Sequence, residues 1–149
     1  MIKLMNREKE LKYEVMQLAI YCDIIPQILK ECSEISVVKL SFFSIFVRNS
    51  NNMSKIYDLR GKKNSFEKII STYSGSIDRI LDALPYIISA IDLLAKKELI
   101  KVVQGKVSSS NSLSSNDSKY VLSSFVVDAL KESEKLSDEQ FMKEVITNV

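Results

Sequence analysis

The chain of 149 residues contains no histidine, and only three glycines, two prolines and two cysteines. Without histidine it lacks the commonest general base at neutral pH, the usual catalytic triads and most zinc sites. With three glycines in total, neither a phosphate-binding loop nor a dinucleotide-binding loop can be written. The two cysteines lack CxxC spacing and so do not ligate a structural zinc. We therefore expect no catalytic residue, no cofactor and no metal, and a protein that is not an enzyme.

The cysteines also indicate a compartment. Cys22 and Cys32 lie ten residues apart in one helical pattern, so a continuous helix separates them by about 15 Å, beyond disulfide reach. We interpret them as core thiols in a reducing environment. The N-terminus, MIKLMNREKE, is too charged for a signal peptide. The longest apolar stretch, Ile35–Val47, contains Lys39 and is too short for a membrane span. We predict a cytoplasmic protein with no membrane partner.

Composition favours one folded domain over residues 1–149. Apolar residues make up 46% of the chain, and the net charge is only +2. A chain this apolar should bury a core. Its charge gives no overall attraction to nucleic acid or membrane. We predict a mainly α fold with a small β-hairpin, that is, a winged-helix-like helical domain.

The N-terminal segment, residues 1–34, has the spacing of one long helix. Apolar side chains recur every seven residues and again four residues after three of these, at Leu4, Leu11, Val15, Leu18, Cys22, Ile25, Leu29 and Cys32. This pattern predicts a single apolar stripe. Pro26 cannot donate its amide and should kink or split the helix. The stripe belongs either to a core helix or to a helix that binds a partner, with Leu11 and Leu18 as contacts.

Residues 35–126 form the predicted winged-helix-like core. Ile35–Val47 is apolar on nearly every side and is predicted as a buried helix, with a strand as the alternative. A second helix follows the apolar spacing from Ile77 to about Lys97, and Pro85 should bend it. A short helix from about Ser65 to Tyr73 is predicted between them.

The β-hairpin, or wing, is predicted over residues 99–124. Leu99–Val107 is rich in valine and is interpreted as one strand, with Gly105 at a bulge. Residues 108–118, SSSNSLSSNDS, form a serine-rich tip. The second strand is predicted over residues 119–123.

The C-terminal segment, residues 127–149, is predicted to be helical. Ser137 and Gln140 have the spacing of a capping box that opens the last helix. One face of that helix is apolar. It is either ordinary core or a docking face for a partner, with Phe141, Met142, Val145 and Ile146 as contacts.

A basic patch lies in the middle of the chain. Residues 48–68 hold six basic side chains against two acidic ones. Candidate contacts to DNA phosphates are Arg48, Lys55, Arg60, Lys62 and Lys63, and the alternative is a solvated basic loop. The helix before the wing reads DNA in many winged-helix proteins. Here the charge on its polar side is negative, which is the wrong sign for contact with DNA. This helix offers Asp78, Asp82 and Asp92 against Arg79.

The order of these segments resembles the small middle component of bacterial three-component ABC ATPase systems, such as the Lamassu small subunit. The resemblance covers residues 11–107, through ISVVKLSFFSIFV, SFEKII and LPYIISAIDLLAKKELIKVV. It implies a non-catalytic accessory subunit that bridges an SMC-like coiled-coil ATPase and an effector nuclease in an anti-phage or anti-plasmid defence complex. The complex would sense DNA, with indirect or non-specific contact from this chain. The alternative is a stand-alone winged-helix DNA-binding regulator, dimeric through its first helix.

Overall fold

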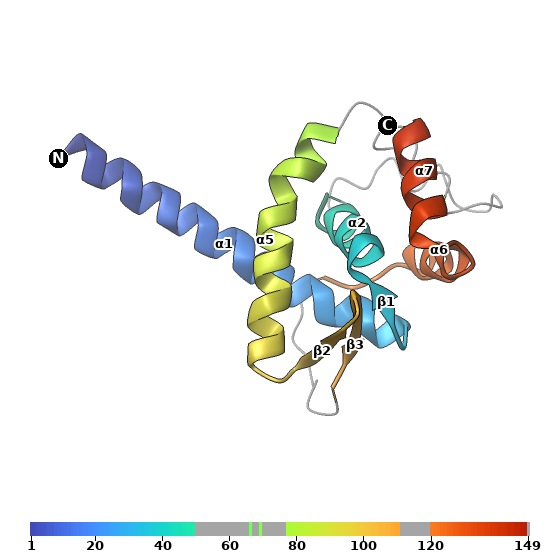
Figure 1. Ribbon diagram of the computed structural model, residues 1–149. Helices are drawn as coiled ribbons and strands as arrows, with labels where there is room; N and C mark the ends of the chain where they lie inside the picture. Colours follow the sequence, from blue (N-terminus) through green and yellow to red (C-terminus); the bar gives the residue numbers. More distant parts are fainter. Residues whose placement is uncertain (50–65, 67–68, 70–76, 111–119, 149) are drawn as a thin grey trace.

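The computed structural model describes residues 1–49, 66, 69, 77–110 and 120–148. In these residues it is mainly α-helical with a small antiparallel sheet, as the sequence predicts (Figure 1). A helix, a short strand and a second helix come first. After the gap at residues 70–76 come a long helix, a β-hairpin and two C-terminal helices. Among the described elements, one long helix lies directly before the β-hairpin and two helices follow it.

Helix α1, Ile2–Glu31, is a single uninterrupted helix. Pro26 lies inside it and is buried, so the predicted split does not occur. The first half of α1 projects from the body of the molecule, and every residue from 1 to 16 is exposed (Figure 1). We call Met1–Met16 the arm. The second half lies in the core and buries six further side chains, at Gln17, Tyr21, Ile24, Ile25, Ile28 and Leu29.

The apolar segment after α1 forms helix α2, Val37–Asn49, as predicted. Strand β1, Ile35–Ser36, precedes it and was not predicted. The Ser36 hydroxyl accepts a hydrogen bond from the Lys39 amide at 3.2 Å, which caps the first turn of α2. All residues of α2 from Leu40 to Val47 are buried. A helix that is apolar all round is therefore surrounded by its own domain.

The hairpin is shorter than predicted. Strand β2, Ile100–Val103, pairs with β3, Lys106–Ser109, and β3 also pairs with β1, which gives the order β1-β3-β2. Gln104 and Gly105 form the two-residue loop, with φ of 51° and 74°. Two successive positive φ angles are the signature of a type I′ turn, whose twist suits a tight hairpin. The valine-rich run therefore supplies both strands.

The predicted wing over 99–124 needs correction for this reason. The serine-rich tract contributes Ser108 and Ser109 to β3. The predicted second strand at 119–123 is not one: Tyr120–Ser123 forms no strand and leads directly into helix α6, Ser124–Glu134. The Ser123 hydroxyl accepts a hydrogen bond from the Val126 amide and caps that helix. The remainder of the serine-rich tip, residues 111–118, lies outside the described residues.

Helices α5, Ile77–Lys96, and α7, Asp138–Asn148, complete the body. The predicted capping box at α7 is confirmed. The Gln140 amide donates to the Ser137 hydroxyl at 3.2 Å, and the Ser137 amide donates to the Gln140 side-chain oxygen at 3.0 Å. Of the helix predicted from Ser65 to Tyr73, only two residues are described, Phe66 and Ile69; both are helical and buried.

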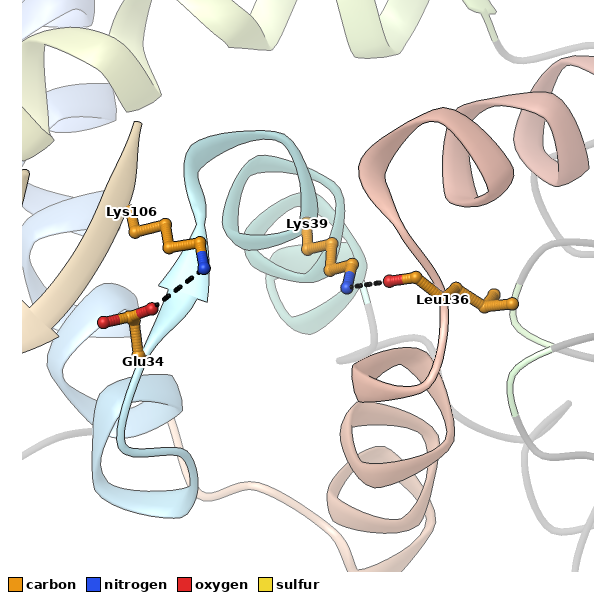
Figure 2. Close-up of polar contacts among 4 residues, drawn as sticks. All are labelled: Glu34, Lys39, Lys106 and Leu136. Atoms are coloured by element: carbon orange, nitrogen blue, oxygen red, sulfur yellow. Dashed lines mark hydrogen bonds and ion pairs between the residues drawn. The ribbon is translucent and has the colours of Figure 1, made fainter. Parts of the chain in front are cut away.

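An aromatic cluster joins α7 to α2. The rings of Phe42, Phe43, Phe66 and Phe141 have centroids 5.1 to 6.4 Å apart. One polar contact supports the same packing: the Lys39 ammonium donates to the Leu136 carbonyl at 2.6 Å (Figure 2). A separate ion pair, between Lys106 of β3 and Glu34 at 3.2 Å, joins the hairpin to the segment before β1. The C-terminal helices are thus packed into the domain core.

Candidate interaction surface

The described residues contain no group of three or more histidine, cysteine, aspartate or glutamate side chains that could hold a metal ion. Both cysteines are free thiols, half-buried at Cys22 and buried at Cys32. The Cys32 thiol donates a hydrogen bond to the Ile28 carbonyl at 3.3 Å. Burial, with smaller effects from Glu134 and Glu31, raises the pKa of Cys32 to about 11. A thiol held in its neutral form is a poor nucleophile.

Of the five candidate phosphate contacts, the structure places Arg48 alone. Its Nη1 donates to the Tyr21 hydroxyl at 3.2 Å, and its guanidinium lies 5.4 Å from the centre of the Tyr21 ring. Burial raises the pKa of Tyr21, and Arg48 partly offsets this. Arg48 therefore holds α2 against α1. The other four candidates, Lys55, Arg60, Lys62 and Lys63, lie outside the described residues.

Arg48 also lines a cleft of about 460 Å³ where α1, α2 and α5 meet. Its polar groups come from Tyr13, Gln17, Tyr21, Arg48, Asn49, Arg79, Asp82 and Tyr86. The Gln17 side-chain oxygen is buried there without a hydrogen-bond partner. Among the described residues this lining holds no serine, cysteine or lysine.

The candidate docking residues of α7 divide into two pairs. Phe141 is 0% exposed and Val145 is 6% exposed, and both belong to the domain core. They are therefore core residues and not docking residues, because α7 must bury this face to pack on α2. Met142 and Ile146 remain exposed.

The outer face of α5 is a surface that sequence reasoning missed. Leu81 is 56% exposed, Ile88 is 55% exposed, and Pro85 between them is also exposed. Their spacing of four and three residues places them on one side of the helix. We call these three residues the α5 stripe. Leu81 and Ile88 share the helical apolar spacing of the buried residues of α5, and α5 has more apolar positions than one core face needs. That surplus was the available signal.

Acidic side chains lie along one edge of the α5 stripe. Asp78, Asp82 and Asp92 are all exposed, as is Arg79. Asp92 forms an ion pair with Lys96 at 2.9 Å, and that contact raises the pKa of Lys96. The core face of the same helix consists of Ile87, Ala90, Ile91 and Leu94. An apolar stripe with an acidic border thus faces outward from α5.

The arm is the second exposed apolar surface. Its stripe residues Leu4, Leu11 and Val15 are 57 to 66% exposed. Leu18, the next residue along, is half-buried against the core. The structure therefore leaves the predicted contact Leu11 open and covers much of Leu18.

No protein-family model, no curated protein and no solved structure matches this chain. Within the described residues, no helix combines the length and apolar character that crossing a membrane requires.

Proposed function

We propose that this protein is a non-catalytic accessory subunit that docks through the outer face of α5. The observation that carries the proposal is the exposed α5 stripe, Leu81, Pro85 and Ile88, with its acidic border. An apolar stripe at this spacing is typical of a helix that enters an apolar groove of another protein. Exposed apolar side chains that lie together on one helix face mark an interaction site where they form a contiguous patch.

The position of α5 in the fold sharpens this argument. α5 precedes the hairpin, the place that the DNA-reading helix occupies in winged-helix proteins. A helix that enters the major groove needs donors for base edges and phosphates. α5 instead offers three carboxylates against Arg79 and Lys96, and Lys96 is paired with Asp92. This face therefore offers little attraction to a polyanion, and the proposed ligand is a protein.

The resemblance supplies the proposed partners. They are an SMC-like coiled-coil ATPase, bound by the α5 stripe, and an effector nuclease that the complex restrains until it senses foreign DNA. The docking groove on the ATPase should be apolar with basic side chains along its edge, because Asp78 and Asp82 border the stripe. The basic residues Lys62 and Lys63 could then contact DNA held by the ATPase.

The test is affinity purification of the tagged chain from cells that express its neighbouring genes, with mass spectrometry of what is recovered. We expect a large coiled-coil ATPase at fixed stoichiometry with the natural chain. Ile88→Asp should lose it, because the substitution places a charge in the apolar contact. Ser89→Asp is the matched control, since it adds the same charge at the adjacent exposed position, and it should retain the ATPase.

Two results would overturn the proposal. One is recovery of the chain without any ATPase. The other is sequence-specific DNA binding by the isolated chain that survives physiological salt, which is the property of a stand-alone regulator. A charge reversal of Lys62 and Lys63 that leaves DNA-dependent activation unchanged would remove the DNA contact alone.

A further inference from the structure

We propose that the arm pairs with the arm of a second copy of this chain, as an antiparallel two-helix coiled coil. This inference concerns a different surface from the α5 stripe and does not depend on the proposed function. It starts from the exposure of Leu4, Leu11 and Val15 on a helix that projects from the body (Figure 1). A stripe at heptad spacing is buried when a second helix of the same spacing lies against it.

The charges beside the stripe select the orientation. If Leu4, Leu11 and Leu18 are heptad positions d, then Glu8 and Val15 are positions a, and Arg7 and Glu14 are positions g. In an antiparallel pair the g positions of the two helices face each other. Arg7 of each copy then faces Glu14 of the other, which gives two opposite-charge contacts. Within the described residues neither Arg7 nor Glu14 has an ion-pair partner, so both are available.

A parallel pair would bring like charges together. Position a of one helix then faces position a of the other, which places the two Glu8 carboxylates opposite each other in the apolar seam. Position g faces position e of the next heptad, which places Arg7 against Lys12. Both contacts are repulsive. In the antiparallel pair each Glu8 lies opposite Leu11 and its carboxylate can reach the edge beside Lys12 of the second copy.

The length of the arm fits the same register. In this register Leu4 lies opposite Val15, Glu8 opposite Leu11 and Met1 opposite Leu18, and the facing g positions Arg7 and Glu14 are offset by two residues, about 3 Å along the axis. The two arms then overlap along their whole length of about 24 Å, and each N-terminus ends where the other helix enters its own core at Gln17. Leu18, half-buried by its own domain, would gain cover from Met1 of the second copy.

The side of the arm that continues the core-facing side of α1 is charged. The side of α1 that faces the core is marked by Gln17, Tyr21 and Ile28. By helical spacing that side continues along the arm as Glu10 and Glu14, and Glu14 is itself a g position. The apolar stripe lies next to that side: its continuation, Ile25 and Leu29, is buried in the core, whereas Leu4, Leu11 and Val15 of the arm are exposed. A dimer of this kind would carry two α5 stripes, and a paired subunit would bind a two-fold partner more tightly by avidity.

Cysteine cross-linking of the full chain tests the orientation. The background is Cys22→Ser, since Cys22 is half-buried and Cys32 is buried with its pKa raised to about 11. One preparation carries Leu4→Cys and another carries Val15→Cys. Under mild oxidation the mixture should form a cross-linked dimer, and each preparation alone should not, because identical positions lie about 16 Å apart in the antiparallel register. Dimers from each preparation alone would show the parallel arrangement and overturn the proposal.

Sedimentation of the isolated chain tests the pairing itself. The natural chain should form a dimer that dissociates on dilution, and Leu11→Asp should be a monomer. Asn6→Asp, which adds the same charge on the polar side of the arm, should remain dimeric. Ile88→Asp should also remain dimeric, which separates this test from that of the α5 stripe. A monomer at every concentration would overturn the proposal.

Charge reversal tests the contact between Arg7 and Glu14. Arg7→Glu and Glu14→Arg should each weaken the dimer about tenfold, because two attractive pairs become repulsive. The double variant restores both pairs and should recover the natural affinity. In a parallel dimer Arg7→Glu would instead pair with Lys12 and strengthen association. Strengthening, or no rescue in the double variant, would contradict the antiparallel register.

Discussion

The two halves of α1 carry the same stripe of apolar side chains into different environments. In the second half Ile25 is 0% exposed and Leu29 is 2% exposed, whereas Leu4 and Leu11 of the arm are 66% and 60% exposed. The residue types and the spacing are alike. The difference therefore comes from what the remainder of the chain places beside each half: α2, α5 and the hairpin surround the second half, and the arm extends past them (Figure 1).

The largest expected effect comes from truncating a buried side chain in the second half of α1, compared with truncating an exposed side chain in the arm. Ile28→Ala should lower the free energy of unfolding by about 2–5 kcal/mol, because Ile28 is fully buried and its loss leaves a cavity. Leu11→Ala should change it by less than about 0.5 kcal/mol. Urea denaturation at concentrations where the natural chain is monomeric measures both. Equal losses of stability in the two variants would mean that the monomer buries Leu11 as well as Ile28.

This comparison also shows which part of the fold the sequence could predict. The heptad spacing of α1, the all-round apolar character of α2 and the capping box at Ser137 are local patterns, and each predicted element is present. The hairpin was placed wrongly because a type I′ turn at Gln104 and Gly105 has no Asn-Gly or Asp-Gly signal. β1 was missed because two residues carry no periodicity, and it exists only because β3 lies beside it.

The candidate surfaces were harder to predict, for a related reason. Apolar spacing indicates that a side chain will be buried but not by which molecule. Phe141 and Met142 are neighbours in one apolar segment, yet Phe141 packs on Phe42 and Phe66 while Met142 faces outward. In α5 the same ambiguity hid Leu81 and Ile88 among core positions. Only the packing of the other helices divides an apolar helix into a core face and a docking face.

The next largest expected effect concerns Arg48 of α2, which contacts Tyr21 near the start of the buried half of α1. Arg48→Met should destabilise the protein by about 1–3 kcal/mol, because it leaves the Tyr21 hydroxyl buried without its donor. Combining it with Tyr21→Phe removes both partners and should recover part of that loss. Denaturation of the single and double variants measures the coupling. Strictly additive losses would mean that the hydrogen bond contributes nothing to holding α1 against α2.

The two cysteines differ in burial: Cys22, within α1, is half-buried, and Cys32, at the end of the helix, is buried. Burial raises the pKa of Cys32 to about 11, from its ordinary value of 9.0. The folded state therefore keeps this proton while the unfolded state releases it, and stability must fall as pH rises from about 9 to about 11. The loss due to Cys32 should be about 2–3 kcal/mol.

Cys32→Ala provides the control for this pH effect. Tyrosine and lysine titrations are common to both proteins, so the difference between their stability curves isolates the thiol. We expect the curves to converge above pH 9, since the natural chain loses the contribution that the variant never had. Parallel curves from pH 8 to 11 would contradict a raised pKa. Thiol reagents should modify half-buried Cys22 before Cys32 in the folded protein.

The smallest expected effect locates the boundary between the two halves. Tyr13 is exposed, yet its ring lies edge-on to Tyr86 of α5, with centroids 6.1 Å apart. Such a pair contributes about 0.5–1.5 kcal/mol, and we expect the lower end because Tyr13 is solvated. A double-mutant cycle of Tyr13→Ala and Tyr86→Ala measures it. A coupling near zero would mean that Tyr13 does not hold the arm against α5. The first contact between α1 and the body would then be at Gln17, where burial begins. A clear coupling means that α5 already fixes the direction of the arm four residues earlier, so that the stripe is presented to a second copy at a defined angle.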